Sequence, residues 1–317
     1  MSGSPKPKIM LFVGIGIAIV IISFLTLSIP EPEPEPEAIK VVRLTPEEVL
    51  ESGQEEIDKL DDQQLIEFGD YFTDNRMYDA SLIFYNTVLT RNENDIRALN
   101  GAGYSLFRID KFDEAINHFN QVLDIHPSNV NAINGIGTTY IGLERYDEAI
   151  SYFKTSIEKR PNNANSYNGL ATAQFFLNEY MEAEKNFKKS LEIDPRKVVT
   201  YNGLALLQLN SGNVIEAEKN YRHALDLSQN NPDSLVGLGT ILLSQGSMEE
   251  ANLMFQQARQ IDFEAVNTML VQAKIFVEVG RNQEALLLIE NVLRFDPSNN
   301  EAIELKDAVN SILLSQK

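Results

Sequence analysis

One unit of thirty-four residues restarts along most of this chain and constrains its fold more than any other feature. The starts fall, without insertion or deletion, at Asp62, Ile96, Val130, Ala164, Val198, Pro232 and Val266. The second unit carries Leu99, Gly103, Ala115, Phe119 and Pro127, and the third carries Ile133, Gly137, Ala149, Phe153 and Pro161 at the same positions. A period of this length predicts a solenoid, in which each unit packs on its neighbours.

The recurring residues resemble the tetratricopeptide repeat, whose signature has a bulky residue at position 4, Gly or Ala at 8, Ala at 20, an aromatic residue at 24 and Pro at 32. The first unit fits least well, because Ala80 stands one place early and Glu93 takes the proline position. The resemblance covers residues 62–299. It implies an all-α fold: a right-handed superhelical solenoid of seven helix-turn-helix repeats, here repeats 1 to 7, each with a first helix A and a second helix B.

Small residues, turns and caps agree with this interpretation. Gly or Ala at position 8 and Ala at position 20 allow two antiparallel helices to approach closely. Between the two helices, four repeats have residues that tolerate a left-handed conformation: Asn178, Gly212, Gly246 and Gly280. We expect residues 300–317 to form a capping helix at the carboxyl end. At the other end, Thr45, Pro46 and Glu48 predict a capping box and an amino-terminal capping helix over 46–61.

The amino terminus predicts a transmembrane helix over residues 9–29. These twenty-one residues carry no charge. A helix of that length reaches about 31 Å, against a hydrocarbon core of about 30 Å. A cleaved signal peptide is the alternative, although its apolar core is usually shorter and no Ala-x-Ala-like site precedes Pro30.

Charges beside the predicted span suggest its orientation. Lys6 and Lys8 precede it, so the positive-inside rule places residues 1–8 in the cytoplasm and the repeats outside it. Residues 30–45 begin with PEPEPEPE and predict a Glu/Pro-rich stalk, extended as polyproline II. The alternative for this stretch is a disordered linker whose charge only keeps it soluble. We therefore expect a single-pass membrane protein with the repeats displayed on a stalk.

Composition excludes several classes of function. The net charge of −19 and the lack of a basic stripe argue against nucleic acid as a partner. The acidity is explained by solubility, and a basic partner surface is the functional alternative. The chain has no cysteine, and its three histidines lie in different repeats without metal-ligand spacing. We identify no catalytic residues, metal ligands or cofactor, and expect the chain not to be an enzyme.

A binding surface is therefore the remaining candidate for function. Position 5 is asparagine in repeats 2 to 5, at Asn100, Asn134, Asn168 and Asn202, and glycine follows each one. In the family that the chain resembles, position 5 faces the concave groove, and a row of amides suits the backbone of an extended peptide. The following glycines indicate close approach by either a ligand backbone or a neighbouring helix.

Other groove residues complete the candidate partner-binding site. Position 12 is apolar in repeats 2 to 7, and the candidates there are Phe107, Ile141 and Phe175. At position 9 the candidates are Tyr104, Thr138 and Thr172. An alternative role for the apolar row is to pack the groove floor. The lysines and asparagines with which chaperone-binding relatives grip a carboxyl terminus are missing, since Ile66, Asp70, Gly101 and Gly135 stand at those positions.

Together these features predict a membrane-anchored scaffold that binds a protein or peptide segment in the concave groove. The alternative is a structural assembly subunit that uses its convex face or its capping helices. An enzyme is a remote third alternative. The oligomeric state is not predicted.

Overall fold

In the computed structural model, the described residues are 45–261, 265–278 and 280–315, and all regular secondary structure within them is α-helical. The chain divides into two compact units, residues 1–93 and 94–317, each described by itself below. Residues 1–8, the predicted span 9–29 and nearly all of the predicted stalk lie outside the described residues. Within the described ranges, every helix is too short or too polar to cross a membrane.

The described part of the first unit holds the amino-terminal cap and repeat 1. Its helices are α1 (Pro46–Ser52), α2 (Gln54–Ile57), α3 (Asp62–Asp74) and α4 (Tyr78–Arg91). The capping box is confirmed: Glu48 N–H donates to Thr45 Oγ1 at 3.2 Å, and Thr45 N–H donates to Glu48 Oε2 at 2.8 Å. The prediction of one helix over 46–61 is wrong, because Gly53 adopts φ 88° and separates α1 from α2.

The segment of α1 and α2, called the cap here, contacts α3 and α4. The Arg91 guanidinium at the end of α4 donates to the Leu60 and Asp58 carbonyls at 2.7 and 2.8 Å. Tyr71 of α3 donates a hydrogen bond to the Glu47 carboxylate of α1. Val49 of α1 and Ile57 of α2 are buried. This short segment therefore covers the apolar side of the first helix pair.

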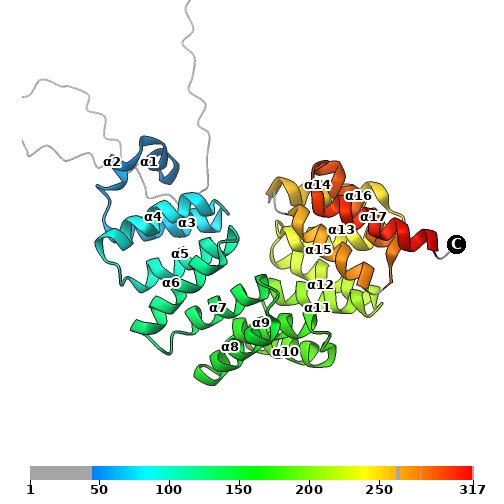
Figure 1. Ribbon diagram of the computed structural model, residues 1–317, viewed down its shortest axis with the longest axis horizontal. Coiled ribbons are helices and arrows are strands. Elements are labelled where there is room, and N and C mark those ends of the chain that lie inside the picture. Colours follow the sequence, from blue (N-terminus) through cyan, green and yellow to red (C-terminus); the bar gives the residue numbers. More distant parts are fainter. Residues whose placement is uncertain (1–44, 262–264, 279, 316–317) are drawn as a thin grey trace, which may run out of the picture. The chain divides into compact units, whose positions relative to one another are not determined.

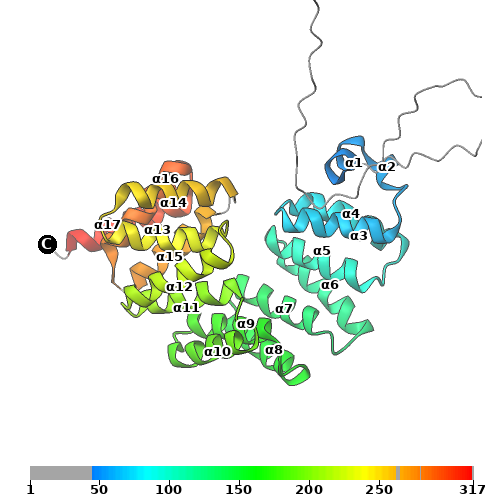
Figure 2. The ribbon, with the colours of Figure 1, turned by 180° about the vertical axis from the view of Figure 1, so that it is seen from behind.

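The second unit continues as helix pairs, shown from two sides in Figure 1 and Figure 2. They are α5 (Ile96–Arg108) and α6 (Phe112–Ile125), α7 (Val130–Gly142) and α8 (Tyr146–Lys159), α9 (Ala164–Phe176) and α10 (Tyr180–Ile193), α11 (Val198–Asn210) and α12 (Val214–Leu227), α13 (Pro232–Ser244) and α14 (Met248–Ile261), and α15 (Ala265–Glu278) and α16 (Asn282–Phe295). Helix α17 (Asn300–Ser315) follows. Each A helix packs on its own B helix and on the next A helix.

Local chemistry explains where the helices begin and end. Four A helices of the second unit and α17 start after an Asn or Asp whose side chain accepts a hydrogen bond from a backbone N–H of the first turn: Asp95, Asn129, Asn163, Asn231 and Asn299. Helices α6, α8, α10 and α16 end two residues before Pro127, Pro161, Pro195 and Pro297. The thirty-four-residue period therefore carries its own start and stop signals.

The turn inside every pair has one left-handed residue, always at position 15. The predicted turn residues Asn178, Gly212, Gly246 and Gly280 have φ between 61° and 83°. Repeats 1 to 3 adopt the same conformation with Arg76, Asp110 and Glu144, at φ of 58° to 59°. Sequence alone does not reveal the turn at Arg76 and Glu144, because such side chains rarely adopt positive φ, whereas aspartate, as at Asp110, adopts it more often.

Helix α13, near the carboxyl-terminal end of the second unit, is almost entirely buried. In α13, Pro232 and every residue from Ser234 to Leu243 are buried, including the positions that face the groove in other repeats. A helix that is apolar on all sides is a core helix. Helix α17 packs on α16 and buries Ala302 and Val309, while Ile303 and Ala308 remain exposed.

Candidate functional site

The candidate groove residues that remain accessible lie on α5, α7 and α9. Tyr104 is 42 % exposed, and its hydroxyl accepts a hydrogen bond from Arg108 at 3.3 Å. Phe107, Thr138, Ile141 and Thr172 are half-buried. The Tyr104 and Phe107 rings are 6.3 Å apart between centroids and tilted by 46°. The A helices of repeats 2 to 4 therefore present an aromatic and aliphatic surface with three hydroxyls, those of Tyr104, Thr138 and Thr172.

The asparagine row joins one repeat to the next. Asn134 Oδ1 accepts from Ser166 Oγ at 3.1 Å, Asn168 Oδ1 accepts from Thr200 Oγ1 at 2.9 Å, and Asn202 Oδ1 accepts from Ser234 Oγ at 2.6 Å. Each donor stands at position 3 of the following repeat. Three of the four amide oxygens are thus used inside the stack, and Asn134 as a whole is only 9 % exposed. Their predicted contact with a partner stays a prediction.

Two of these bonds extend to a buried serine of helix B, Ser156 or Ser190. Ser156 Oγ lies 2.7 Å from Ser166 Oγ, and Ser190 Oγ lies 3.0 Å from Thr200 Oγ1. Ser156 and Ser190 both occupy position 27, at the end of helix B. The three polar side chains bridge helix A of one repeat, helix B of the same repeat and helix A of the next. Buried polar groups that satisfy one another fix the register of the helices that carry them.

Asn100 lacks this arrangement. Position 3 of repeat 3 is Ala132 and position 27 of repeat 2 is Val122, so neither supplies a hydroxyl. The Asn100 amide group donates to the Ile96 carbonyl at 2.8 Å, while its Oδ1 is buried without a hydrogen-bond partner. The first asparagine of the row therefore differs chemically from the other three.

The glycines at position 6 make room for the aromatic ring of the preceding repeat. An ideal Cβ would lie 2.5 Å from the Phe119 ring at Gly135, 2.2 Å from Phe153 at Gly169, 2.5 Å from Phe187 at Gly203 and 2.2 Å from Tyr221 at Gly237. Burial raises the pKa of the enclosed Tyr221 well above its ordinary range. Of the two explanations left open by the sequence, the neighbouring helix accounts for these four glycines.

Repeat 7 covers part of the predicted groove. Phe175 is only 5 % exposed and belongs to an apolar cluster that includes Leu207 of α11 and Ile275 of α15. The Arg281 guanidinium, 4.2 Å from the Phe276 ring centroid, donates to the Leu209 carbonyl at 3.1 Å. Phe175 is therefore a core residue here, which contradicts its prediction as a residue accessible to a partner.

Charge is segregated between the two kinds of helix. The A helices of repeats 2 to 5 contain no Asp or Glu, and their only cations are Arg97 and Arg108. The B helices of the same repeats hold three carboxylates each. Among the described residues, no three His, Asp or Glu side chains gather as metal ligands would. Within the helices of repeats 2 to 5, the carboxylates are thus carried by the B helices and not by the A helices of the candidate surface.

Comparison with known proteins identifies the class. Sequence profiles described as tetratricopeptide repeat match residues 98–129, 129–196 and 202–262. The chain belongs to the tetratricopeptide repeat family, whose members generally mediate protein–protein interactions. No curated protein matches it in sequence.

Solved structures agree on the fold. A thermophilic protein of the family from Thermus thermophilus is 21 % identical with a TM-score of 0.55, over 58 % of this chain and 100 % of its own. A tetratricopeptide repeat protein from Parabacteroides merdae is 18 % identical with a TM-score of 0.50, over 78 % and 98 % of the two chains. The APC/C hetero-tetramer Cut9–Hcn1 is 14 % identical with a TM-score of 0.54, over 83 % of this chain and 58 % of that one. At such identities the likeness concerns the fold alone.

Proposed function

We propose that this chain is a membrane-anchored scaffold that binds an extended polypeptide segment along the A helices of repeats 2 to 4. The observation that carries the proposal is the half-exposed row on α5, α7 and α9: Tyr104, Phe107, Thr138, Ile141 and Thr172. The corresponding positions of α13, Thr240 and Leu243, are buried. The proposed binding surface is thus confined to the repeats whose side chains at these positions are not buried by other parts of the chain.

The repeat assignment and the anchor extend beyond the matched residues. Repeats 1 and 7 are assigned by the thirty-four-residue period and by their helix pairs α3–α4 and α15–α16. The anchor is residues 9–29, with residues 1–8 in the cytoplasm and the repeats on the other side. We expect protease added to intact cells to digest the repeats. Digestion only after lysis would reverse the orientation.

The partner segment is bound chiefly through its backbone and its apolar side chains. Hydroxyls at Thr138 and Thr172 and the Tyr104 phenol offer hydrogen bonds beside the Phe107 and Ile141 surfaces. The A helices of repeats 2 to 4 carry no carboxylate that could bind a basic partner. The net charge of −19 therefore gives no preference for a basic partner at this surface. The asparagines act by holding successive A helices in register.

A photo-crosslinking amino acid tests this surface in the full chain. Placed at Tyr104, it should form a polypeptide adduct in cells, and Thr138→Arg should reduce that adduct at least tenfold by filling the groove. Met181→Arg is the matched control, because Met181 of α10 is 86 % exposed on a B helix. Circular dichroism should be the same for both variants. An adduct unaffected by Thr138→Arg would contradict groove binding.

A structural assembly subunit is the second candidate, and one observation favours it. Position 18 is acidic in repeats 1 to 3 and in repeat 6, at Asp79, Asp113, Asp147 and Glu249. Repeats 4 and 5 instead have Met181 and Ile215, 86 % and 80 % exposed. Two exposed apolar side chains at the same position of neighbouring B helices suit an assembly contact. Loss of complexes in Met181→Arg, with Thr138→Arg unaffected, would select this function.

A further inference from the structure

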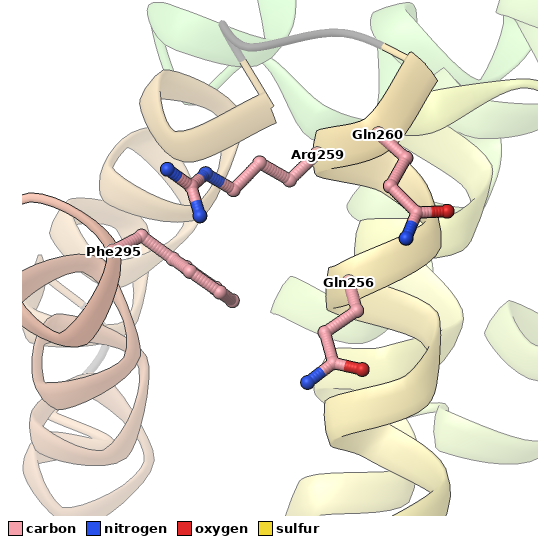
Figure 3. A pocket seen from close by; sticks show the side chains of 4 residues that line it. All are labelled: Gln256, Arg259, Gln260 and Phe295. Atoms are coloured by element: carbon pink, nitrogen blue, oxygen red, sulfur yellow. The ribbon is translucent and has the colours of Figure 1, made fainter.

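A surface pocket lies between α14 and α16, the B helices of repeats 6 and 7. The candidate groove, in contrast, lies on A helices. Gln256, Arg259 and Gln260 of α14 and Phe295 of α16 line a volume of about 270 Å³. Figure 3 shows the Phe295 ring projecting into the space between the helices, with Arg259 extended toward it. The Arg259 Cζ is 5.0 Å from the ring centroid. This volume suits one side chain or one terminal residue of a partner.

The other repeats of the same chain show how unusual Arg259 is. It occupies position 28, where all six other repeats have an aliphatic residue: Leu89, Leu123, Ile157, Leu191, Leu225 and Leu293. Those side chains are half-buried between helices, as Arg259 is. Leucine or isoleucine is therefore sufficient for packing at this position. The guanidinium adds a cation and hydrogen-bond donors that packing does not require.

Repeats 6 and 7 also depart from the repeat pattern at position 29. Repeats 2 to 5 have a carboxylate there, at Asp124, Glu158, Glu192 and Asp226. Repeat 6 has the neutral Gln260, which lines the pocket, and repeat 7 has Arg294, which donates to Asn252 Oδ1 of α14 at 3.1 Å. Repeats 6 and 7 thus lack the carboxylate of position 29 and have two arginines, Arg259 and Arg294, at positions 28 and 29. Both changes favour an anion.

We propose that this pocket binds a carboxylate of a partner polypeptide, with the carboxylate on the Arg259 guanidinium and an apolar group on the Phe295 ring. Arginine donates two parallel hydrogen bonds to a carboxylate, and these charge-assisted bonds are roughly twice as strong as neutral ones. The amides of Gln256 and Gln260 supply further neutral donors. A phosphate dianion is matched by clusters of arginines rather than by one lining cation. The site is distinct from the groove on α5, α7 and α9.

Small probes on the full chain in nanodiscs test the proposal. N-acetyl-phenylalanine and the α-amide of N-acetyl-glutamate carry a terminal and a side-chain carboxylate, and N-acetyl-phenylalaninamide carries neither. We expect one of the two carboxylates to shift the Arg259 Nε–H resonance, with at least tenfold weaker binding of the amide. Whichever carboxylate binds identifies whether the partner offers its terminus or a side chain.

Variants that restore the repeat pattern give the decisive comparison. Arg259→Leu places the residue that five of the other repeats carry, so the fold should survive, and carboxylate binding, followed by the probe's own resonances, should weaken at least tenfold. Gln260→Glu restores the carboxylate of repeats 2 to 5 and should weaken binding severalfold. Arg222→Leu on α12 is the control with the same charge change. Equal binding by the wild type and Arg259→Leu, or equal binding of acid and amide, overturns the proposal.

Discussion

Replacing Gly169 by alanine is expected to lower the free energy of unfolding by about 2 to 3 kcal/mol. Helix propensity alone predicts the opposite sign, because alanine is favoured over glycine by about 1 kcal/mol inside a helix. Packing decides the outcome. The new Cβ would lie 2.2 Å from the Phe153 ring, much closer than real side-chain contacts permit.

The Phe153 ring has little room to retreat. It is 1 % exposed, and an ideal Cβ on Gly137 of its own repeat would already lie 2.9 Å from it. Relief therefore requires the A helices to separate, which weakens the contact between neighbouring repeats. Urea unfolding followed by circular dichroism measures the loss. Hydrogen exchange in repeats 3 and 4 shows whether the loss is local, since repeat arrays need not unfold in one step.

Two further variants identify the cause. Gly137→Ala has the milder contact, and repeats 4 and 5 have Ala171 and Ala205 at that position, so its effect should stay below about 1 kcal/mol. Phe153→Leu should be costly alone, but should cost much less in the Gly169→Ala background. A Gly169→Ala protein as stable as the wild type would show that the ring adapts without strain.

Most of the fold could be predicted because its signals are local and periodic. The A-helix starts at Ile96, Val130 and Ala164 follow from spacing alone and coincide with those of the structure. The break at Gly53 was missed, because a capping box and an acidic run read as one continuous helix until the backbone angle is known. Arg76, Asp110 and Glu144 were missed as turn residues for the same reason.

The candidate site was harder to predict because its determinants are distant in sequence. The asparagine row was found, yet what it contacts depends on hydroxyls thirty-two residues further on, at Ser166, Thr200 and Ser234. Recurrence of Ser or Thr at position 3 was a usable signal. Nothing local, however, indicates that Ile275 covers Phe175 from one hundred residues away. That contact depends on how successive repeats curve.

The hydroxyl at Thr200 provides the second test with a large expected effect. Thr200→Val should lower the free energy of unfolding by about 2 kcal/mol, because it leaves the Asn168 Oδ1 acceptor without its hydroxyl donor. Ser190 Oγ keeps its hydrogen bond to the Ala164 carbonyl at 2.9 Å. Valine matches the shape of threonine, so cavity formation contributes little. It removes the donor to Asn168 Oδ1, at 2.9 Å, and a hydroxyl 3.0 Å from Ser190 Oγ. Thr138→Val, at a half-exposed position of repeat 3, should change stability by less than about 0.5 kcal/mol.

The converse substitution tests the same bond by adding it. Ala132 occupies position 3 of repeat 3, opposite the unpartnered Asn100 Oδ1, so Ala132→Ser should supply the missing donor. The gain should be about 1 kcal/mol in urea unfolding, the usual net value of a hydrogen bond. The Asn100→Leu background controls for other effects of the serine, because no acceptor remains there. If Ala132→Ser stabilises both backgrounds equally, the Asn100 oxygen is not the cause. If it stabilises only the wild type, the asparagine row acts by binding one repeat to the next.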